Sequence, residues 1–259
     1  MVLKELQSLI LSTQTPQDSL SVSLKNFTYK LGKVFFENIS LNLSLGEWTA
    51  VIGRSGIGKS TLLRIISGLE ISKNMQLDIN FGNQRLPAGS ISYLAQHDTL
   101  LPWLNVQSNI TFSARLRGEY SNPTFITDIL AETGLINFRE HYPHQLSGGL
   151  RQRTNLARIL YEKRPIVLMD EPFSSLDMIS RYEIQDLARK FLKNHIVLLV
   201  THDLVEAARL CDRTYIMYGE PIKIDELKML TNDYNKPISF GNPIINQQAK
   251  IMFDLILKR

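Results

Sequence analysis

A glycine-rich turn set between two different hydrophobic patterns constrains this chain more than any other feature. The turn reads Gly-Arg-Ser-Gly-Ile-Gly-Lys-Ser-Thr over residues 53–61. Before it, residues 48–52 form an apolar run typical of a strand buried in a parallel sheet. After it, residues 60–67 repeat leucine and isoleucine with helical spacing and end at Gly68. A buried strand, a glycine turn and a helix in this order predict an α/β fold with a phosphate-binding loop at the strand end.

The turn fits the pattern G-x-x-x-x-G-K-[ST], with Gly53, Gly58, Lys59 and Ser60 at the defining positions. Glycine lets the loop wrap so that successive backbone N–H groups point at phosphate oxygens, and the helix start adds a positive partial charge. Lys59 is expected to reach the β- and γ-phosphates, and the Ser60 hydroxyl to ligate Mg²⁺. The predicted nucleotide-binding residues of this loop are Gly53, Arg54, Ser55, Gly56, Ile57, Gly58, Lys59, Ser60 and Thr61.

Two carboxylates follow a second strongly apolar run. Asp170 and Glu171 come directly after residues 166–169, which read Ile-Val-Leu-Met. Such a pair by itself is often a solvated turn or a helix cap. Beside a phosphate-binding loop, Asp170 is expected to hold Mg²⁺ through water, and Glu171 to face the γ-phosphate and polarise the attacking water.

Strands and helices alternate through much of the chain. A helix is predicted over residues 180–191 and a third apolar strand over residues 196–200, which favours a parallel sheet covered by helices. The alternating residues 39–45 predict a half-buried antiparallel strand. Residues 97–145 hold several prolines, short helical patches and no strong strand, which predicts an inserted helical subdomain. A closing helix is expected over residues 247–257.

Composition narrows the class of protein. The 259 residues are 44% hydrophobic and 21% charged, which excludes a disordered tail, a collagen-like repeat or a coiled-coil rod. The single cysteine cannot form an internal disulfide. The formal net charge of +4 is too small, and lysine and arginine are too scattered, to indicate nucleic acid as a partner.

The N-terminal residues resemble neither a signal peptide nor a membrane span. Glutamate and other polar residues interrupt the pattern that a signal peptide needs. Leu3, Leu6 and Ile10 would share one face of a short amphipathic helix. Apolar runs such as residues 196–200 are far shorter than the roughly 20 residues that cross a bilayer. A soluble cytoplasmic chain is the expectation.

Between the two site motifs lies Leu-Ser-Gly-Gly at residues 146–149, followed by Leu-Arg-Gln-Arg. Here the chain resembles the ATP-binding cassette (ABC) ATPases, whose signature motif this segment matches, and the resemblance covers about residues 22–220. It implies ATP and Mg²⁺ as cofactors and a P-loop NTPase fold: a RecA-like parallel-sheet core with an antiparallel β subdomain and an inserted helical subdomain. The implied parts are an N-terminal extension (residues 1–20), an ABC ATPase domain (residues 21–220, with the helical subdomain at about 97–160) and a C-terminal segment (residues 221–259).

The resemblance also implies roles for further residues. Tyr29 looks like the aromatic residue that stacks on adenine, with a plain strand tyrosine as the alternative. Gln96 is similar to the glutamine that touches Mg²⁺ and the attacking water. Residues 174–177 resemble the D-loop, and His202 resembles the switch histidine. The implied catalytic residues are thus Glu171, His202 and Gln96, and the implied metal ligands are Ser60, Gln96 and Asp170.

Ser147, Gly148 and Gly149 stand at the start of a predicted helix, whose exposed N–H groups favour an anion. In the ABC family this segment faces away from its own P-loop and binds the γ-phosphate of ATP held by a second chain. The resemblance therefore implies a homodimer, paired head to tail with two ATP molecules in the interface. Hydrolysis would open the pair, which makes it a ligand-dependent switch.

The process that such an ATPase drives has three candidate classes. The first is a membrane importer for a small solute, and the second is an exporter, a lipoprotein-release system or a division complex. The third is a soluble ABC ATPase acting on ribosomes or DNA. The chain has no second cassette, no long coiled-coil insertion and no fused spanning helices, which disfavours the third class and most exporters.

Residues 97–106, His-Asp-Thr-Leu-Leu-Pro-Trp-Leu-Asn-Val, discriminate best among these classes. They resemble the Leu-Leu-Pro-Trp segment of ATPases of the nitrate, sulfonate and taurine importers, including importers of thiamine-pyrimidine precursors. In the family this region lines the groove where a permease helix docks. Trp103 and Leu104 would then contact the partner, with packing inside the helical subdomain as the alternative.

The importer class is therefore favoured, and the resemblance implies its partners. Integral membrane permease subunits would bind directly, and an extracytoplasmic solute-binding protein would act indirectly. The chain would lie peripherally on the cytoplasmic face of the inner membrane. The transported solute is not encoded in these motifs, because specificity would reside in the permease and the binding protein.

Overall fold

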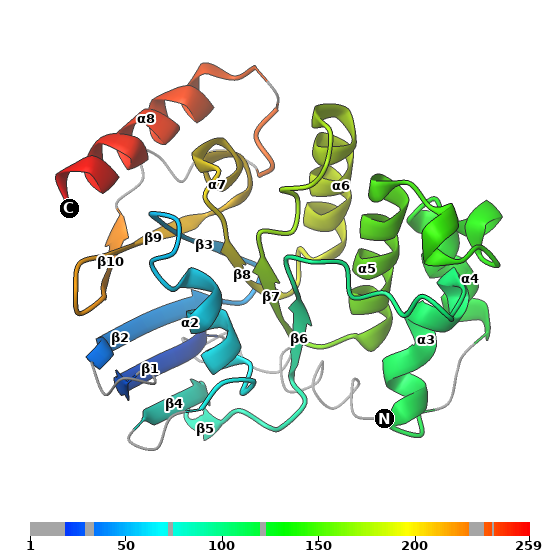
Figure 1. Ribbon diagram of the computed structural model, residues 1–259, viewed down its shortest axis with the longest axis horizontal. Coiled ribbons are helices and arrows are strands. Elements are labelled where there is room, and N and C mark those ends of the chain that lie inside the picture. Colours follow the sequence, from blue (N-terminus) through cyan, green and yellow to red (C-terminus); the bar gives the residue numbers. More distant parts are fainter. Residues whose placement is uncertain (1–18, 29–33, 72–74, 120–122, 228–235, 240) are drawn as a thin grey trace.

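The computed structural model describes residues 19–28, 34–71, 75–119, 123–227, 236–239 and 241–259. Two expectations concern other parts of the chain: the N-terminal helix around Leu3, Leu6 and Ile10, and the aromatic contact of Tyr29, lie outside the described residues. Figure 1 shows the strands at the left and centre of the molecule and a helical lobe at the right.

Within the described residues, a six-stranded sheet forms the core. Its strands are β3 (Trp48–Gly53), β6 (Ile91–Leu94), β7 (Ile166–Asp170), β8 (Ile196–Val200), β9 (Arg213–Tyr218) and β10 (Lys223–Leu227). The spatial order is β10-β9-β3-β8-β7-β6, and neighbours run parallel except for the pair of β10 and β9. β3, β7 and β8 are buried at every position, which explains their continuous apolar sequences.

A second, antiparallel sheet packs beside the first. Its described strands are β1 (Ser19–Thr28), β2 (Val34–Ser44), β4 (Gln76–Phe81) and β5 (Gln84–Arg85), in the order β2-β1-β4-β5. Alternation along β1 and β2 turns one set of side chains inward, so cross-strand apolar pairs form. These pairs are Leu20 with Leu43, Val22 with Leu41, and Leu24 with Ile39. They share a core with α2 (Lys59–Ile66), which lies between the two sheets.

Helices cover the other face of the parallel sheet. They are α5 (Gly148–Glu162), α6 (Met178–Phe191), α7 (Leu204–Leu210) and α8 (Pro243–Lys258), and their apolar residues form one core with β3, β7 and β8. α8 begins earlier than the expected residue 247. The Asn242 side chain accepts a hydrogen bond from the backbone N–H of Ile244, and proline suits the first helical position, so both residues start the helix there.

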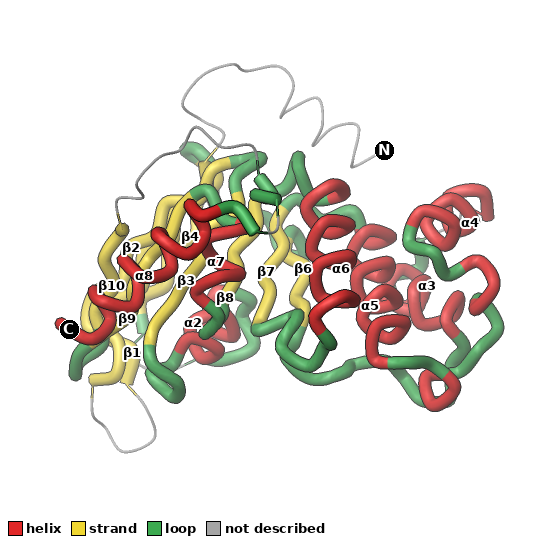
Figure 2. Tube along the Cα trace, turned by 90° about the horizontal axis from the view of Figure 1, so that it is seen from above, coloured by secondary structure: helices red, strands yellow, loops and turns green. Residues whose placement is uncertain are grey.

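The inserted helices have a core of their own. α3 (Val106–Leu116) and α4 (Pro123–Glu132) pack against α5, and Figure 2 shows them at the end of the molecule, beyond α6. The shared buried side chains are Val106, Ile110, Ala114, Ile126, Ile129, Leu130, Leu135, Leu146, Ala157 and Tyr161. The expected α/β fold, with an antiparallel β sheet and a helical insertion, is confirmed. Among the described residues, no helix is both long and apolar enough to cross a bilayer.

Glu206 brings a carboxyl group into the buried contact between α6 and α7. The side chain is 5% exposed, and its Oε2 accepts a hydrogen bond from Nε2 of Gln185 at 3.3 Å. Burial and the nearby negative charge of Asp203 raise the pKa of Glu206 to about 8, although contacts with Thr201 and Arg181 oppose the shift. In the folded protein this carboxyl group is therefore mostly protonated at neutral pH.

The raised pKa of Glu206 predicts how stability depends on pH. Between pH 4.5, which is the ordinary pKa of glutamate, and about pH 8, the folded protein binds more protons than the unfolded chain. Glu206 therefore destabilises the fold increasingly as the pH rises. Glu206→Gln stays neutral and should raise Tm over the parent protein. The increment should grow from about pH 5 to about pH 8.5, as measured by thermal unfolding across that range.

Glu183→Gln is the matched control, because Glu183 lies on α6 and is exposed. Its Tm difference from the parent should stay nearly constant over the same pH range. A constant difference for Glu206→Gln would contradict a buried, protonated Glu206.

Candidate nucleotide site

Three loops meet where β3, β8 and β7 end. Carboxyl ends of adjacent parallel strands lie at one edge of the sheet, and loops at that edge are the usual place of ligand binding in α/β folds. The loops are the P-loop (residues 53–61), the Glu171 loop (residues 171–177) and the His202 loop (residues 201–203). The local sequence explains their position, since each follows an apolar run that forms a buried strand.

Lys59 lies inside the P-loop at the start of α2 and is 5% exposed. Its Nζ donates hydrogen bonds to the backbone carbonyls of Gly53 at 3.0 Å and Arg54 at 3.1 Å. Burial lowers the pKa of Lys59, while the carboxylates of Glu171 and Asp170 oppose the shift. A buried ammonium at the positive end of a helix suits the binding of an anion.

Two of the P-loop glycines, Gly53 and Gly58, have close neighbours. Gly58 has a φ of 104°, a left-handed conformation that other residues rarely adopt, and a Cβ there would lie 2.6 Å from Cε1 of Phe35. A Cβ at Gly53 would lie 2.7 Å from the carbonyl oxygen of Met217 on β9. A side chain at either position would collide with these neighbours, so both positions require glycine.

Ser60 and Asp170 meet although they are far apart in the sequence. The Ser60 hydroxyl donates to Oδ1 of Asp170 at 2.8 Å. On the neighbouring strand β6, the Tyr93 phenol donates to Oδ2 of Asp170 at 3.1 Å. Burial and the Asp170 carboxylate raise the pKa of Tyr93, which keeps the phenol protonated as a donor. Sequence reasoning did not single out Tyr93, because only the pairing of β6 with β7 brings it to Asp170.

Glu171 brings the three expected catalytic residues into one cluster. Its Oε2 accepts a hydrogen bond from Nε2 of Gln96 at 3.0 Å and lies 3.0 Å from Nδ1 of His202. The backbone N–H of Glu171 donates to the carbonyl of Val200 at 2.9 Å, which ties the Glu171 loop to the end of β8. Glu171 has a φ of 45°, unusual for a residue with a side chain, and such strain is often found at functional sites.

Ser147, Gly148 and Gly149 do not join this cluster. The Ser147 hydroxyl accepts a hydrogen bond from the backbone N–H of Leu150 at 3.3 Å and caps α5, while Ser147 and Gly148 are exposed. Figures 1 and 2 both show α5 beyond β6 and β7 when viewed from α2. The exposed helix start and the P-loop of the same chain therefore belong to separate places on the molecule.

Trp103 lies at the tip of a tight loop before α3 and is 69% exposed, which contradicts the alternative of packing inside the helical subdomain. The loop is closed by the buried amide of Asn109. Its Oδ1 accepts from the backbone N–H of Leu101 at 2.7 Å, and its Nδ2 donates to the carbonyl of Leu104 at 2.8 Å. Asn109 thus holds the backbone on both sides of Trp103, so the indole is presented to solvent on a fixed support.

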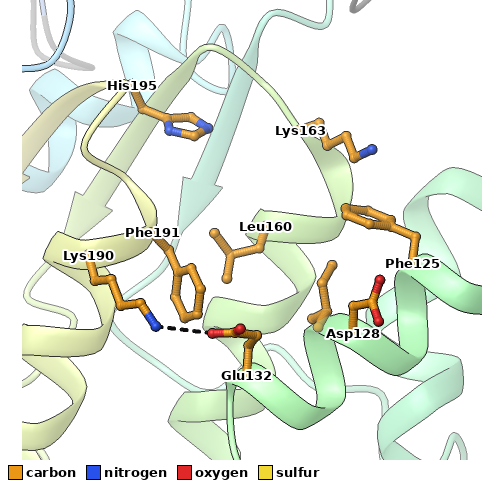
Figure 3. Close-up of a pocket in the computed structure, with 9 residues that line it drawn as sticks. Phe125, Asp128, Glu132, Leu160, Lys163, Lys190, Phe191 and His195 are labelled. Atoms are coloured by element: carbon orange, nitrogen blue, oxygen red, sulfur yellow. Dashed lines mark hydrogen bonds and ion pairs between the residues drawn. The ribbon is translucent and has the colours of Figure 1, made fainter.

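A separate cleft of about 550 Å³ lies between α4, α5 and α6. Phe125, Leu160 and Phe191 line it, and the ion pair of Lys190 with Glu132, 3.1 Å long, borders it (Figure 3). His195 at its edge directly precedes β8. The cleft is therefore at the amino ends of the strands, away from the edge that carries the three loops, and belongs to neither of the expected phosphate-binding segments.

The donors of the site fit a nucleotide with Mg²⁺. Ser60 and Asp170 offer the oxygen ligands that Mg²⁺ prefers, and no group of three or more His, Cys, Asp or Glu residues gathers in the described ranges to hold an ion alone. Mg²⁺ usually takes few protein ligands and completes its shell with phosphate and water. The P-loop amides and Lys59 supply the matching positive charge for the phosphates.

Comparison with known proteins agrees with this geometry. Residues 36–174 match the ABC transporter family. An uncharacterized ABC transporter ATP-binding protein of Haemophilus influenzae is 43% identical over 188 residues, which cover 72% of this chain and 77% of the relative. The aliphatic sulfonates import ATP-binding protein SsuB 1 of Xanthomonas axonopodis pv. citri is 40% identical over 189 residues, covering 71% and 75%. Its namesake in Pseudomonas syringae pv. syringae is 36% identical over 208 residues, covering 80% and 83%.

These relatives confirm the resemblance drawn from the signature motif, including the likeness to sulfonate importers. The roles of the individual site residues stay predictions. The family match and these relatives show that the chain belongs to the ABC transporter family as an ATP-binding subunit, and its activity is the hydrolysis of ATP.

Proposed function

We propose that this chain is the ATPase subunit of a membrane importer for a small solute, and that two copies close around two ATP molecules to drive transport. The observation that supports dimer closure is the division of anion-binding groups between two separate places on one chain. Lys59 and the P-loop form one place, and the exposed helix start at Ser147 forms the other. A head-to-tail pair brings the second group of one chain to the nucleotide of its partner.

In the proposed site, the P-loop amides and Lys59 bind the triphosphate, and Tyr29 stacks on adenine. Ser60, Asp170 and Gln96 hold Mg²⁺, which when bound neutralises charge on the β- and γ-phosphates. The hydrogen bond between Ser60 and Asp170 keeps these two ligands together, and the Tyr93 phenol fixes the Asp170 carboxylate from the other side.

Glu171 acts as the general base of the proposed mechanism. Its carboxylate accepts the proton of the attacking water while the water oxygen bonds to the γ-phosphorus, the bond from the γ-phosphorus to the bridging oxygen breaks, and ADP leaves with that oxygen. Gln96 and His202, both 3.0 Å from Oε2, hold the carboxylate in one orientation. When ADP and phosphate replace ATP, the anion shared by two chains is divided, so the dimer opens.

Import is favoured over other ABC processes by Trp103 and by the relatives. An exposed indole on a fixed loop is a usual anchor for a protein partner, here a permease helix. Two of the three relatives named above are import ATP-binding proteins for aliphatic sulfonates, which makes a small organic anion of that type the first solute to test. A lipoprotein-release, exporter or division complex would use the same ATP site and differ in the membrane partner.

The proposed function includes partner proteins and a location at the membrane. Permease subunits hold it peripherally at the cytoplasmic face of the inner membrane, and an extracytoplasmic solute-binding protein acts on it through the permease. The solute is recognised by these partners, because the ATPase contributes the nucleotide chemistry alone.

Glu171→Gln tests the catalytic role. Glutamine keeps the size of the side chain but is not a base, so turnover should fall by about 10²–10⁴-fold while the Kd for ATP stays near that of the parent. The variant should also accumulate as an ATP-bound dimer in size-exclusion chromatography. Glu183→Gln, exposed on α6, is the control and should keep the parental rate. Hydrolysis by Glu171→Gln at the parental rate would show that Glu171 is not the base.

Trp103→Ala tests the importer assignment. Purification of the tagged chain from membranes should co-purify integral permease subunits, and the variant should retain about tenfold less of them, since an exposed aromatic anchor carries much of an interface energy. Phe253→Ala, which removes an exposed ring from α8, is the control. A co-purified membrane protein with a large extracytoplasmic domain would instead favour the release or division class.

A further inference from the structure

Arg181 joins the Glu171 loop to the His202 loop. It lies in the first turn of α6 and is not among the residues assigned to nucleotide, metal or water. One guanidinium nitrogen donates to the backbone carbonyl of Leu176 at 3.1 Å, and another lies 3.4 Å from Oδ2 of Asp203. Leu176 belongs to the Glu171 loop and Asp203 to the His202 loop, so a single side chain bridges both.

Both loops that Arg181 joins also contain a residue of the catalytic cluster. On one side, the hydroxyl and the backbone N–H of Ser174 donate to the carbonyl of Glu171 at 3.0 Å and 3.3 Å, which folds the Glu171 loop back on itself. On the other side, Asp203 follows His202 directly, and its backbone N–H donates to the Thr201 hydroxyl at 3.0 Å. A displacement of Asp203 would therefore move His202.

The two carboxylate oxygens of Asp203 make different contacts. Oδ1 accepts hydrogen bonds from the backbone N–H groups of Val205 at 2.9 Å and Glu206 at 3.1 Å and caps α7. Oδ2 is the oxygen that faces Arg181. The cap fixes the carboxylate to α7, and Arg181 fixes the same carboxylate to the Glu171 loop.

A second contact joins the two loops directly. Nδ1 of His202 lies 3.0 Å from Oε2 of Glu171, but the His202 side chain is 54% exposed. The side chains of Arg181 and Asp203 are 30% and 33% exposed, and Nε of Arg181 is buried. Arg181 therefore adds a second, partly shielded tie between the two loops, beside the contact made by the exposed imidazole of His202.

We propose that Arg181 is a positioning residue for ATP hydrolysis: by holding Asp203 against the carbonyl of Leu176, it keeps His202 beside Glu171. The inference rests on the proposed catalytic roles of His202 and Glu171. Small displacements of catalytic groups lower rates strongly. Loss of the Arg181 contact should therefore lower kcat and leave ATP binding nearly unchanged.

The test compares Arg181→Met, His202→Ala and the double variant by steady-state ATP hydrolysis. Arg181→Met should lower kcat by about 10–100-fold and change the KM for ATP by less than about threefold. The double variant should be no slower than His202→Ala beyond about threefold, because Arg181 acts through His202. Asp203→Asn keeps an oxygen for the α7 cap but loses the ion pair, so it should reproduce the kcat loss and remains available if Arg181→Met fails to fold.

Arg189→Met is the matched control. Arg189 lies on the same helix and contacts Asp212 through one nitrogen at 2.9 Å and 3.0 Å, with less exposure than Arg181, so its loss should reduce Tm at least as much. Its kcat should stay within about twofold of the parent, because the pair lies away from the catalytic loops.

Two results would overturn the inference while leaving the proposed function in place. These are a parental kcat for both Arg181→Met and Asp203→Asn, or losses from Arg181→Met and His202→Ala that multiply in the double variant. A parental kcat for His202→Ala would instead overturn the proposed role of His202, and the inference with it.

Discussion

The buried ammonium of Lys59 is the charge around which the rest of the site is arranged. Burial disfavours its charged form, and the loop offers backbone carbonyls together with the carboxylates of Asp170 and Glu171 as partial compensation. In the proposed site, a triphosphate completes that compensation. The sheet supplies the geometry, because β3, β7 and β8 end side by side and deliver the ammonium and both carboxylates to one edge.

Strands could be predicted from the sequence where their own residues form a clear apolar pattern. β3, β7 and β8 were expected because a strand buried on both faces must be apolar at every position. β6 was missed because it has only four residues, two of them polar, and β9 because it begins with arginine and threonine. Their positions depend on pairing with strands far away in the sequence, which periodicity does not encode.

The same distinction holds for the candidate site. Residues 53–61 are a contiguous pattern whose spacing carries its own chemistry, so they were recognised directly. Gln96 and His202 required the family resemblance, and the fold brings both to Glu171. Tyr93 and Arg181 were not recognised, since a tyrosine in a strand and an arginine in a helix are ordinary, and only the folded chain shows that they contact Asp170 and Asp203.

The arrangement separates three tasks within one chain. The parallel sheet positions the groups for hydrolysis, the helical subdomain presents the exposed start of α5, and the loop closed by Asn109 presents Trp103. In the proposed function, two of these three surfaces face outward and are completed by another protein. The proposed dimer and permease contacts would use surfaces carried by the same helical subdomain, which would couple ATP hydrolysis to assembly.

The central claim is that each active site combines the P-loop of one chain with the signature segment of another, and a mixing experiment tests it most directly. Lys59→Ala and Ser147→Arg chains should each be inactive alone. An equal mixture should recover about a quarter of the parental hydrolysis, because half of the dimers are mixed and each mixed dimer holds one complete site. A mixture as inactive as its two components would contradict the composite site and place Ser147 at the nucleotide of its own chain.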